Sequence, residues 1–119
     1  MFDTIAMVIL TVKDMKESVF FYEKVLGLPL KFQSPEWSEF KTKGARLGLH
    51  AETDTLKVSA SQKLGISFGF SVTSLDDVYA TLHEKGVQFV TPPRVTSHGK
   101  LAIFKDPNNY LISLGEEDF

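Results

Sequence analysis

Hydrophobic positions in the first half of the chain predict a strand, a helix and three further strands. Segment 5–12 is rich in β-branched residues and ends at two polar residues, which is typical of a strand buried on at least one face. The next apolar residues recur at the spacing of an amphipathic helix, at Met15, Val19, Tyr22 and Leu26. Gly27 then supplies the left-handed conformation that commonly ends a helix. Shorter apolar segments predict strands at 28–33, 37–42 and 46–51.

The second half repeats this order after the polar stretch 53–63, which has no hydrophobic period. Segment 66–72 alternates large apolar and small residues and predicts a strand. A second amphipathic stripe follows at Leu75, Val78, Tyr79 and Leu82, and Gly86 ends that helix. Further strands are expected at 87–90, 100–105 and 110–114. The turn before the last strand places Asn109 where positive φ is expected.

Short-range polar pairs predict how both helices begin. Asp14 with Glu17, and Ser74 with Asp77, have the three-residue spacing of a capping box. The pair at 92–93, two prolines, is expected in a loop between strands.

The repeated order predicts an α+β fold built by internal duplication of a βαβββ module. We expect a single domain, 1–119, made of two modules at about 1–52 and 64–119, joined by the polar linker 53–63. Each module alone would leave one face of a curved four-stranded sheet uncovered. The two curved mixed sheets are therefore expected to surround a shared concave cavity.

Composition narrows the classes of function. The 119 residues are 43% hydrophobic and 24% charged, which is typical of a globular domain, and the absence of Cys excludes thiolate metal sites and a cysteine nucleophile. The formal charge of −2 without a basic run gives no sign of a nucleic-acid partner. No apolar stretch near the start is long enough to span a membrane or has the charged front of a secretory signal. We therefore expect a cytoplasmic protein without nucleic-acid or membrane partners.

Three groups of residues carry a family resemblance: Val8, Leu10, Val12 and Asp14 at the first strand and cap, 21–28 through the helix exit, and 104–114 at the end. In this order and spacing the chain resembles the vicinal oxygen chelate superfamily, which includes glyoxalase I, extradiol dioxygenases, and bleomycin- and fosfomycin-resistance proteins. The resemblance implies the glyoxalase/bleomycin-resistance/dioxygenase fold. It also implies a homodimer, since family members commonly pair modules across two chains.

The resemblance further implies where a divalent metal would be held. The usual His of the first strand corresponds to Met7, and the Glu of the fourth strand to Gly48. The His of the fifth strand corresponds to Ser67 and the Glu of the last strand to Ser113, and neither neighbour of Ser67 is a metal ligand. None of these residues supplies the imidazole or carboxylate that such an ion needs. We therefore expect no metal and no cofactor.

Side-chain alternation predicts which residues face the concavity. They are Met7, Ile9 and Thr11 on the first strand, Arg46, Gly48 and His50 on the fourth, and Ser67, Gly69 and Ser71 on the fifth. Gly and Ser leave volume, and volume without a metal suggests a bulky organic ligand.

Aromatic and cationic residues admit two interpretations. Trp37 and Phe40 are either stacking platforms for a planar ligand or packing partners across strands. Arg46 and Arg94 either bind an anionic group or are solvated charges. The slight acidity of the chain would suit a cationic ligand, but the excess is too small to decide.

Histidines are the remaining candidates for chemistry. His50 is either a proton acceptor inside the cavity or a structural histidine at a strand end. His98 lies in a loop that could cover the cavity mouth, or it is a solvated loop residue. The two could form an atypical metal site only if an acid such as Glu39 converged with them.

The sequence favours a metal-independent protein that sequesters a small organic molecule and resembles bleomycin-resistance proteins. One alternative is a lyase or isomerase of the glyoxalase or dioxygenase type that uses His50 or an atypical metal site; another is a scaffold for protein association. The predicted ligand-binding residues are Met7, Trp37, Phe40, Arg46, Gly48, His50, Ser67, His98 and Ser113.

Overall fold

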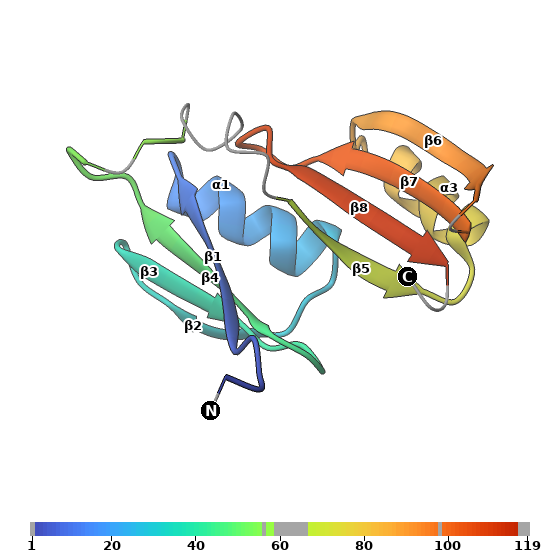
Figure 1. Ribbon diagram of the computed structural model, residues 1–119. Coiled ribbons are helices and arrows are strands. Elements are labelled where there is room, and N and C mark those ends of the chain that lie inside the picture. Colours follow the sequence, from blue (N-terminus) through green and yellow to red (C-terminus); the bar gives the residue numbers. More distant parts are fainter. Residues whose placement is uncertain (1, 56, 59–66, 98, 117–119) are drawn as a thin grey trace. The chain divides into compact units, whose positions relative to one another are not determined.

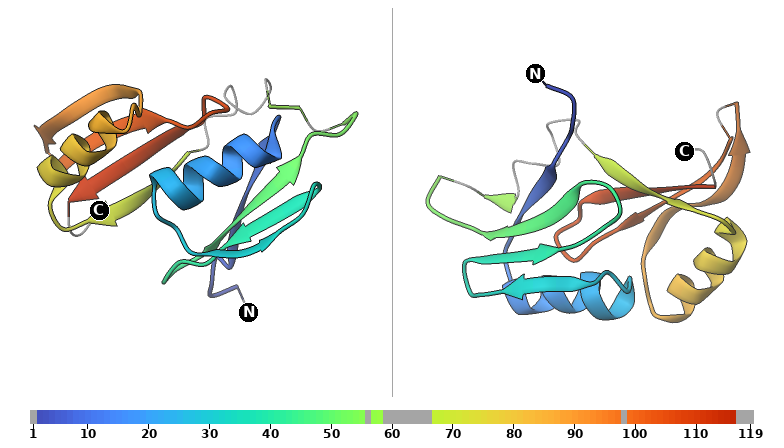
Figure 2. Two further views of the ribbon diagram at one scale, coloured as in Figure 1. Left: turned by 180° about the vertical axis from the view of Figure 1, so that it is seen from behind. Right: turned by 90° about the horizontal axis from the view of Figure 1, so that it is seen from below.

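The structure is a computed structural model that describes residues 2–55, 57–58, 67–97 and 99–116. The chain divides into two compact units, Met1–Ala60 and Ser61–Phe119. Each unit contains one four-stranded mixed sheet with its helix on one face (Figures 1 and 2). Within the described segments, no helix has the length and apolar character needed to cross a membrane.

The first unit has the order strand, helix and three strands. Its elements are β1 (Met7–Val12), α1 (Met15–Phe20), the π-helix η1 (Phe21–Val25), β2 (Leu30–Gln33), β3 (Trp37–Phe40) and β4 (Arg46–Ala51). The strands lie in the order β1-β4-β3-β2, with β1 parallel to β4 and the other pairs antiparallel.

The second unit repeats this topology. Its elements are β5 (Phe68–Val72), α3 (Leu75–Glu84), β6 (Phe89–Thr96), β7 (Gly99–Lys105) and β8 (Leu111–Glu116). The strands lie in the order β5-β8-β7-β6, and β5 is parallel to β8. The predicted α+β fold with two βαβββ repeats is therefore confirmed.

Alternating strand residues build the core beneath α1. Leu10 and Val12 of β1 and Leu47 and Leu49 of β4 are buried, while Ile9 is 58% exposed on the other face. Each fully buried side chain of this kind contributes roughly 1.5–3 kcal/mol to folding. The sheet therefore has one face that packs on the helix and a second face that the helix does not cover.

The first helix differs from the single α-helix that its spacing predicts. From Phe21 onward it widens into a π-helix, and the Leu26 N–H donates to the Phe21 carbonyl, five residues earlier, at 2.9 Å. Gly27 follows with φ of 81°, so the predicted left-handed exit is confirmed. Asn109 likewise has positive φ, at 67°, as predicted.

The two helix starts are capped in different ways. The Asp14 carboxylate accepts the Glu17 N–H at 3.0 Å, as predicted for the first helix. The predicted capping box of the second helix is wrong, because the Ser74 hydroxyl donates to the Asp77 carboxylate instead of capping the backbone. The Leu75 N–H donates to Oε2 of Glu116, at the end of β8, at 2.8 Å. A tertiary contact therefore replaces the local cap.

The loop predicted at Pro92 and Pro93 is also wrong, because both residues lie inside β6. This strand is at the edge of its sheet, where a missing N–H is tolerated, and its register shifts between Thr91 and Arg94. Of the predicted linker 53–63, the structure describes 53–55, 57 and 58. Val58 is buried there, and its N–H donates to the Glu52 carboxylate at 2.8 Å.

The cap from Glu116 predicts the effect of two substitutions. Glu116→Ala should lower the free energy of unfolding by about 1 kcal/mol, because it leaves a helix N–H without its acceptor. Ser74→Ala should cost less, because the Ser74 side chain makes no cap. Urea denaturation of both variants measures the difference, and a larger loss in Ser74→Ala would contradict this account of the helix start.

Candidate ligand-binding site on the first sheet

The face of the first sheet opposite α1, here called the open face, carries most of the predicted site residues. On β3, Ser38 and Phe40 are fully buried toward the helix, and the Ser38 hydroxyl contacts the Met15 sulfur at 3.3 Å. Trp37 and Glu39 alternate with them and therefore project from the open face. On β4, the buried Leu47 and Leu49 likewise leave Arg46, Gly48 and His50 on the open face.

The indole ring of Trp37 lies directly over Gly48. A Cβ atom at position 48 would lie 2.7 Å from Cζ2 and 3.2 Å from Cζ3 of Trp37, which is too close for any side chain unless the ring moves. Trp37 pairs with His50 on the neighbouring strand. The Ser34 hydroxyl fixes the Trp37 backbone, because it donates to the Trp37 carbonyl and accepts the Trp37 N–H. Position 48 therefore has to be glycine for the indole to lie there.

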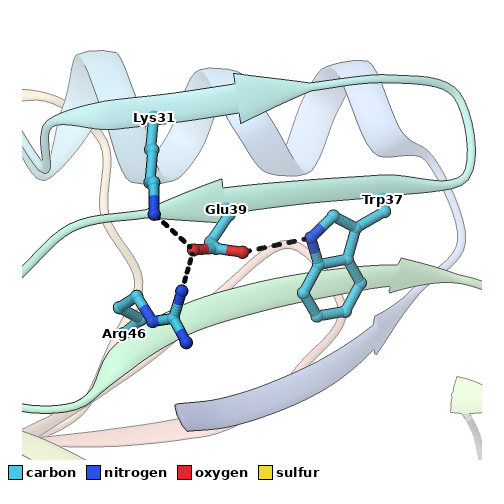
Figure 3. A network of polar contacts seen from close by, with 4 residues as sticks. All are labelled: Lys31, Trp37, Glu39 and Arg46. Carbon is cyan, nitrogen blue, oxygen red and sulfur yellow. Dashed lines mark hydrogen bonds and ion pairs between the residues drawn. The ribbon is translucent and has the colours of Figure 1, made fainter. Parts of the chain in front are cut away.

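Glu39 is the centre of a polar network on the open face (Figure 3). Its Oε1 accepts the Trp37 indole N–H at 3.3 Å. Its Oε2 lies 2.8 Å from Nη1 of Arg46 and 3.4 Å from Nζ of Lys31. The Glu39 side chain is only 12% exposed, whereas Arg46 and Lys31 are 42% and 54% exposed. The network therefore connects β2, β3 and β4 around a nearly covered carboxylate.

The pKa of Glu39 is lowered by its surroundings. Desolvation of the carboxylate acts to raise the pKa, but the indole hydrogen bond and the charges of Arg46 and Lys31 together outweigh it. The carboxylate therefore stays ionised at neutral pH, and both of its oxygens already have donors. Glu39 is accordingly poorly suited to accept a proton from a ligand.

His50 lies beside Trp37, with ring centroids 6.2 Å apart and an edge-to-face angle of 75°. Its Nδ1 is 2.7 Å from the Ala51 carbonyl, which can only accept a hydrogen bond. Nδ1 therefore carries the proton, and in the neutral ring Nε2 is left as an acceptor. This geometry gives His50 one nitrogen with which to contact a ligand.

Three further predicted site residues are Phe40, His98 and Met7. Phe40 does not lie on the open face, because it is one residue out of phase with Trp37 and packs under the sheet against Tyr22, with centroids 5.9 Å apart. Its interpretation as a packing residue is correct, and its interpretation as a stacking platform is wrong. His98 lies outside the described residues. Met7 begins β1 opposite Arg46, on the same face as Ile9.

The second unit places Ser67 and Ser113 in the equivalent arrangement. Ser113 pairs with Gly69, two residues after Ser67, just as Gly48 pairs with Ile9, two residues after Met7. The match of Ser67 to the fifth-strand position therefore needs no shift of one residue. Ser67 is exposed and Ser113 partly buried.

The residues at the four positions do not fit a divalent metal. Met7 offers a thioether, Gly48 no side chain, and Ser67 and Ser113 neutral hydroxyls, none of which replaces imidazole or carboxylate ligands. In the part of the chain that the structure describes, no three His, Cys, Asp or Glu residues gather into a group that could hold a metal ion. These four positions therefore do not supply the ligands of a divalent metal.

Two residues of the Glu39 network, Trp37 and Arg46, are among the predicted ligand-binding residues, whereas Glu39 and Lys31 are not. The sequence predicts Glu39 only as a partner of the histidines in a metal site and predicts no role for Lys31. The alternation of Trp37 and Glu39 was visible in the sequence and places both on one face. Lys31 could not be found in this way, because its approach to Glu39 depends on the pairing of β2 with β3 and on the register shift between them.

Comparison with known proteins identifies relatives along nearly the whole chain. The model of the Glyoxalase/Bleomycin resistance protein/Dioxygenase superfamily matches residues 4–114. The chain is 29% identical over 117 residues to the uncharacterized protein YraH of Bacillus subtilis strain 168, covering 88% of this chain and 91% of YraH. It is also 29% identical over 119 residues to a probable lactoylglutathione lyase of Vibrio cholerae serotype O1, covering 88% and 84%.

A solved structure shares the fold at lower identity. The bleomycin-binding protein of Streptomyces verticillus, complexed with copper(II)-bleomycin, superposes with a TM-score of 0.76 at 17% identity and covers 99% of this chain and 100% of that one. At this identity the likeness concerns the fold alone.

The contact of Trp37 with Gly48 predicts a spectroscopic change. Gly48→Ala should push the ring outward, shift the emission of the single tryptophan to longer wavelength and lower stability by about 1–3 kcal/mol. Gly44→Ala is the control, because its Cβ would meet only Thr42 Oγ1, at 4.0 Å. Unchanged emission in Gly48→Ala would show that the ring does not depend on glycine here.

The lowered pKa of Glu39 predicts how stability varies with pH. Because the folded chain binds this proton less readily than the unfolded chain, the contribution is complete above the ordinary pKa of 4.5 and is lost as pH falls through the lowered value. Glu39→Gln should therefore differ most from the parent near neutral pH, and the difference should shrink as the pH falls below the ordinary pKa of 4.5. Denaturant titrations from about pH 6 to about pH 3 measure this difference, with the exposed Glu36→Gln as control. A constant difference across this range would contradict the prediction.

Proposed function

The chain belongs to the glyoxalase/bleomycin resistance protein/dioxygenase superfamily, and from this membership we propose that it binds a small organic molecule on the open face without a metal. Trp37, Arg46 and His50 would form the contacts in the first unit. Ser67 and Ser113 stay predicted ligand-binding residues of the second unit.

One observation carries this proposal: an indole ring lies over Gly48, the position that corresponds to a metal-binding carboxylate in the family resemblance. A half-buried indole offers a flat apolar surface on which another ring can stack. The neighbouring network keeps the ring in place through its N–H. The glycine at one metal-ligand position thus leaves room for a ring on which an organic ligand can stack.

The bleomycin-binding protein of Streptomyces verticillus supports a binding role by analogy. Its structure contains copper(II)-bleomycin, so this fold can hold a metallated organic molecule. Fold alone does not specify a ligand, however, and the ligand here has to be inferred from the side chains of the open face.

An enzymatic alternative has its own support. The Vibrio cholerae relative is named a probable lactoylglutathione lyase, and the free Nε2 of a neutral His50 could take a proton from a bound substrate. In that case His50 would be the catalytic residue of a lyase or isomerase. A divalent metal held with His50 would be the other form of this alternative.

Thermal denaturation against two panels separates the candidates. A ligand that prefers the folded state raises the melting temperature. We expect stabilisation by members of a panel of aromatic compounds with different charges, and none by Ni(II), Zn(II), Mn(II) or Fe(II). Trp37→Leu should remove the stabilisation, whereas Phe20→Leu, an exposed aromatic residue on α1, should keep it. Stabilisation by a metal that is lost in His50→Ala would favour the enzyme, and no response to either panel would contradict ligand binding.

Homodimerisation and a cytoplasmic location stay predictions. Light scattering on the purified chain would measure the first. A monomer at micromolar concentration would contradict it.

A further inference from the structure

The open face carries an excess of positive charge although the whole chain is slightly acidic. Lys31 and Arg46 both approach the same oxygen of Glu39, so two cations surround one anion. The remaining open-face residues of β1, which are Met7, Ile9 and Thr11, have no charge. The local balance of the network is therefore opposite in sign to the net charge of −2.

Both cations keep donors for a further acceptor. Arg46 uses Nη1 for Glu39, and a guanidinium has five N–H groups, of which the remaining ones can donate elsewhere. The Arg46 and Lys31 side chains are 42% and 54% exposed, so a ligand could reach them. Glu39 restricts the orientation of both, which lowers the conformational cost of binding an anion.

Glu39 itself is not available to a cationic ligand. Its side chain is 12% exposed, Oε1 accepts the Trp37 N–H, and Oε2 accepts from both cations. A ligand ammonium would have to displace one of these donors and would approach the positive groups that are more exposed than the carboxylate. The geometry therefore selects against cations.

The cations lie next to the aromatic surface. The Glu39 carboxylate connects them, with the Trp37 indole at one oxygen and the two cations at the other (Figure 3). A molecule complementary to this arrangement would have a flat ring beside the indole and a carboxylate at the cations. Arg in particular matches a carboxylate with two parallel hydrogen bonds.

We propose that the ligand class of this site is the aromatic carboxylates, with Trp37 contacting the ring and Arg46 and Lys31 binding the carboxylate. This inference rests on the proposed function. It specifies the charge of the ligand, which membership of the family leaves open.

Isothermal titration calorimetry with three probes on one ring system tests the inference. The probes are 2-naphthoate, 2-naphthamide and 2-naphthylmethylammonium, which differ mainly in charge. We expect 2-naphthoate to bind about tenfold more tightly than the amide, since a hydrogen bond between charged groups exceeds a neutral one by about this factor. The ammonium should bind more weakly than either.

Matched variants locate the preference. Arg46→Gln and Lys31→Gln should each reduce the affinity for 2-naphthoate and leave that for 2-naphthamide nearly unchanged. Lys16→Gln removes the same charge from α1, on the other side of the sheet, and should keep the full preference. An equal loss of affinity in Lys16→Gln would show that net charge, not the site, selects the anion.

The outcomes separate the inference from the function on which it rests. If the amide or the ammonium binds as tightly as the carboxylate, the inference is overturned while ligand binding stands. If none of the three probes binds and the aromatic panel gives no thermal shift, the proposed function fails as well. If the preference persists in both Arg46→Gln and Lys31→Gln, the carboxylate lies elsewhere and the assignment of its partners is wrong.

Discussion

The arrangement of the open face depends on the paired Glu39 carboxylate. A carboxylate that is largely removed from water needs donors for both oxygens, and here they come from Trp37, Arg46 and Lys31. These residues lie on three neighbouring strands, so satisfying one anion fixes side chains across most of the sheet. The hydrogen bond from the Trp37 indole N–H to Glu39 orients the ring above Gly48, the position where the family resemblance places a metal ligand. The ring in this position and a side chain at position 48 therefore exclude each other.

Most of the fold could be predicted because its determinants are periodic and local. The buried residues alternate along β1 and β4, and those of α1 form one stripe, because the strands and the helix pack against each other in one core. The hydrophobic pattern is therefore sufficient to identify both modules. The errors arise where a distant contact replaces a local one. The cap supplied by Glu116 to α3 comes from 41 residues away, and Ser74 gives no sign of it. The sheet edge that accommodates Pro92 becomes visible only once the strand order is known.

Prediction of the site was limited in a different way. Strand alternation correctly placed Arg46, Gly48 and His50 on the face away from the helix. The same alternation puts Phe40 on the helix side, because it differs in parity from Trp37, and Phe40 is buried there. The contact between Lys31 and Glu39 depends on which strands are neighbours and in which register, and hydrophobic periodicity does not specify either. The net charge of −2 does not describe the open face, because it averages over the whole chain.

The prolines of β6 also affect the tendency of this protein to aggregate at high concentration. Neither Pro92 nor Pro93 has an N–H, so they divide the eight residues of this edge strand into Phe89–Thr91 and Arg94–Thr96. Segments that assemble into amyloid-like fibres need about six uninterrupted residues of high β propensity. Each half of β6 is shorter than that. An edge that carries Val90 and Val95 in water, at 50% and 82% exposure, is thereby made a poor template for fibre growth.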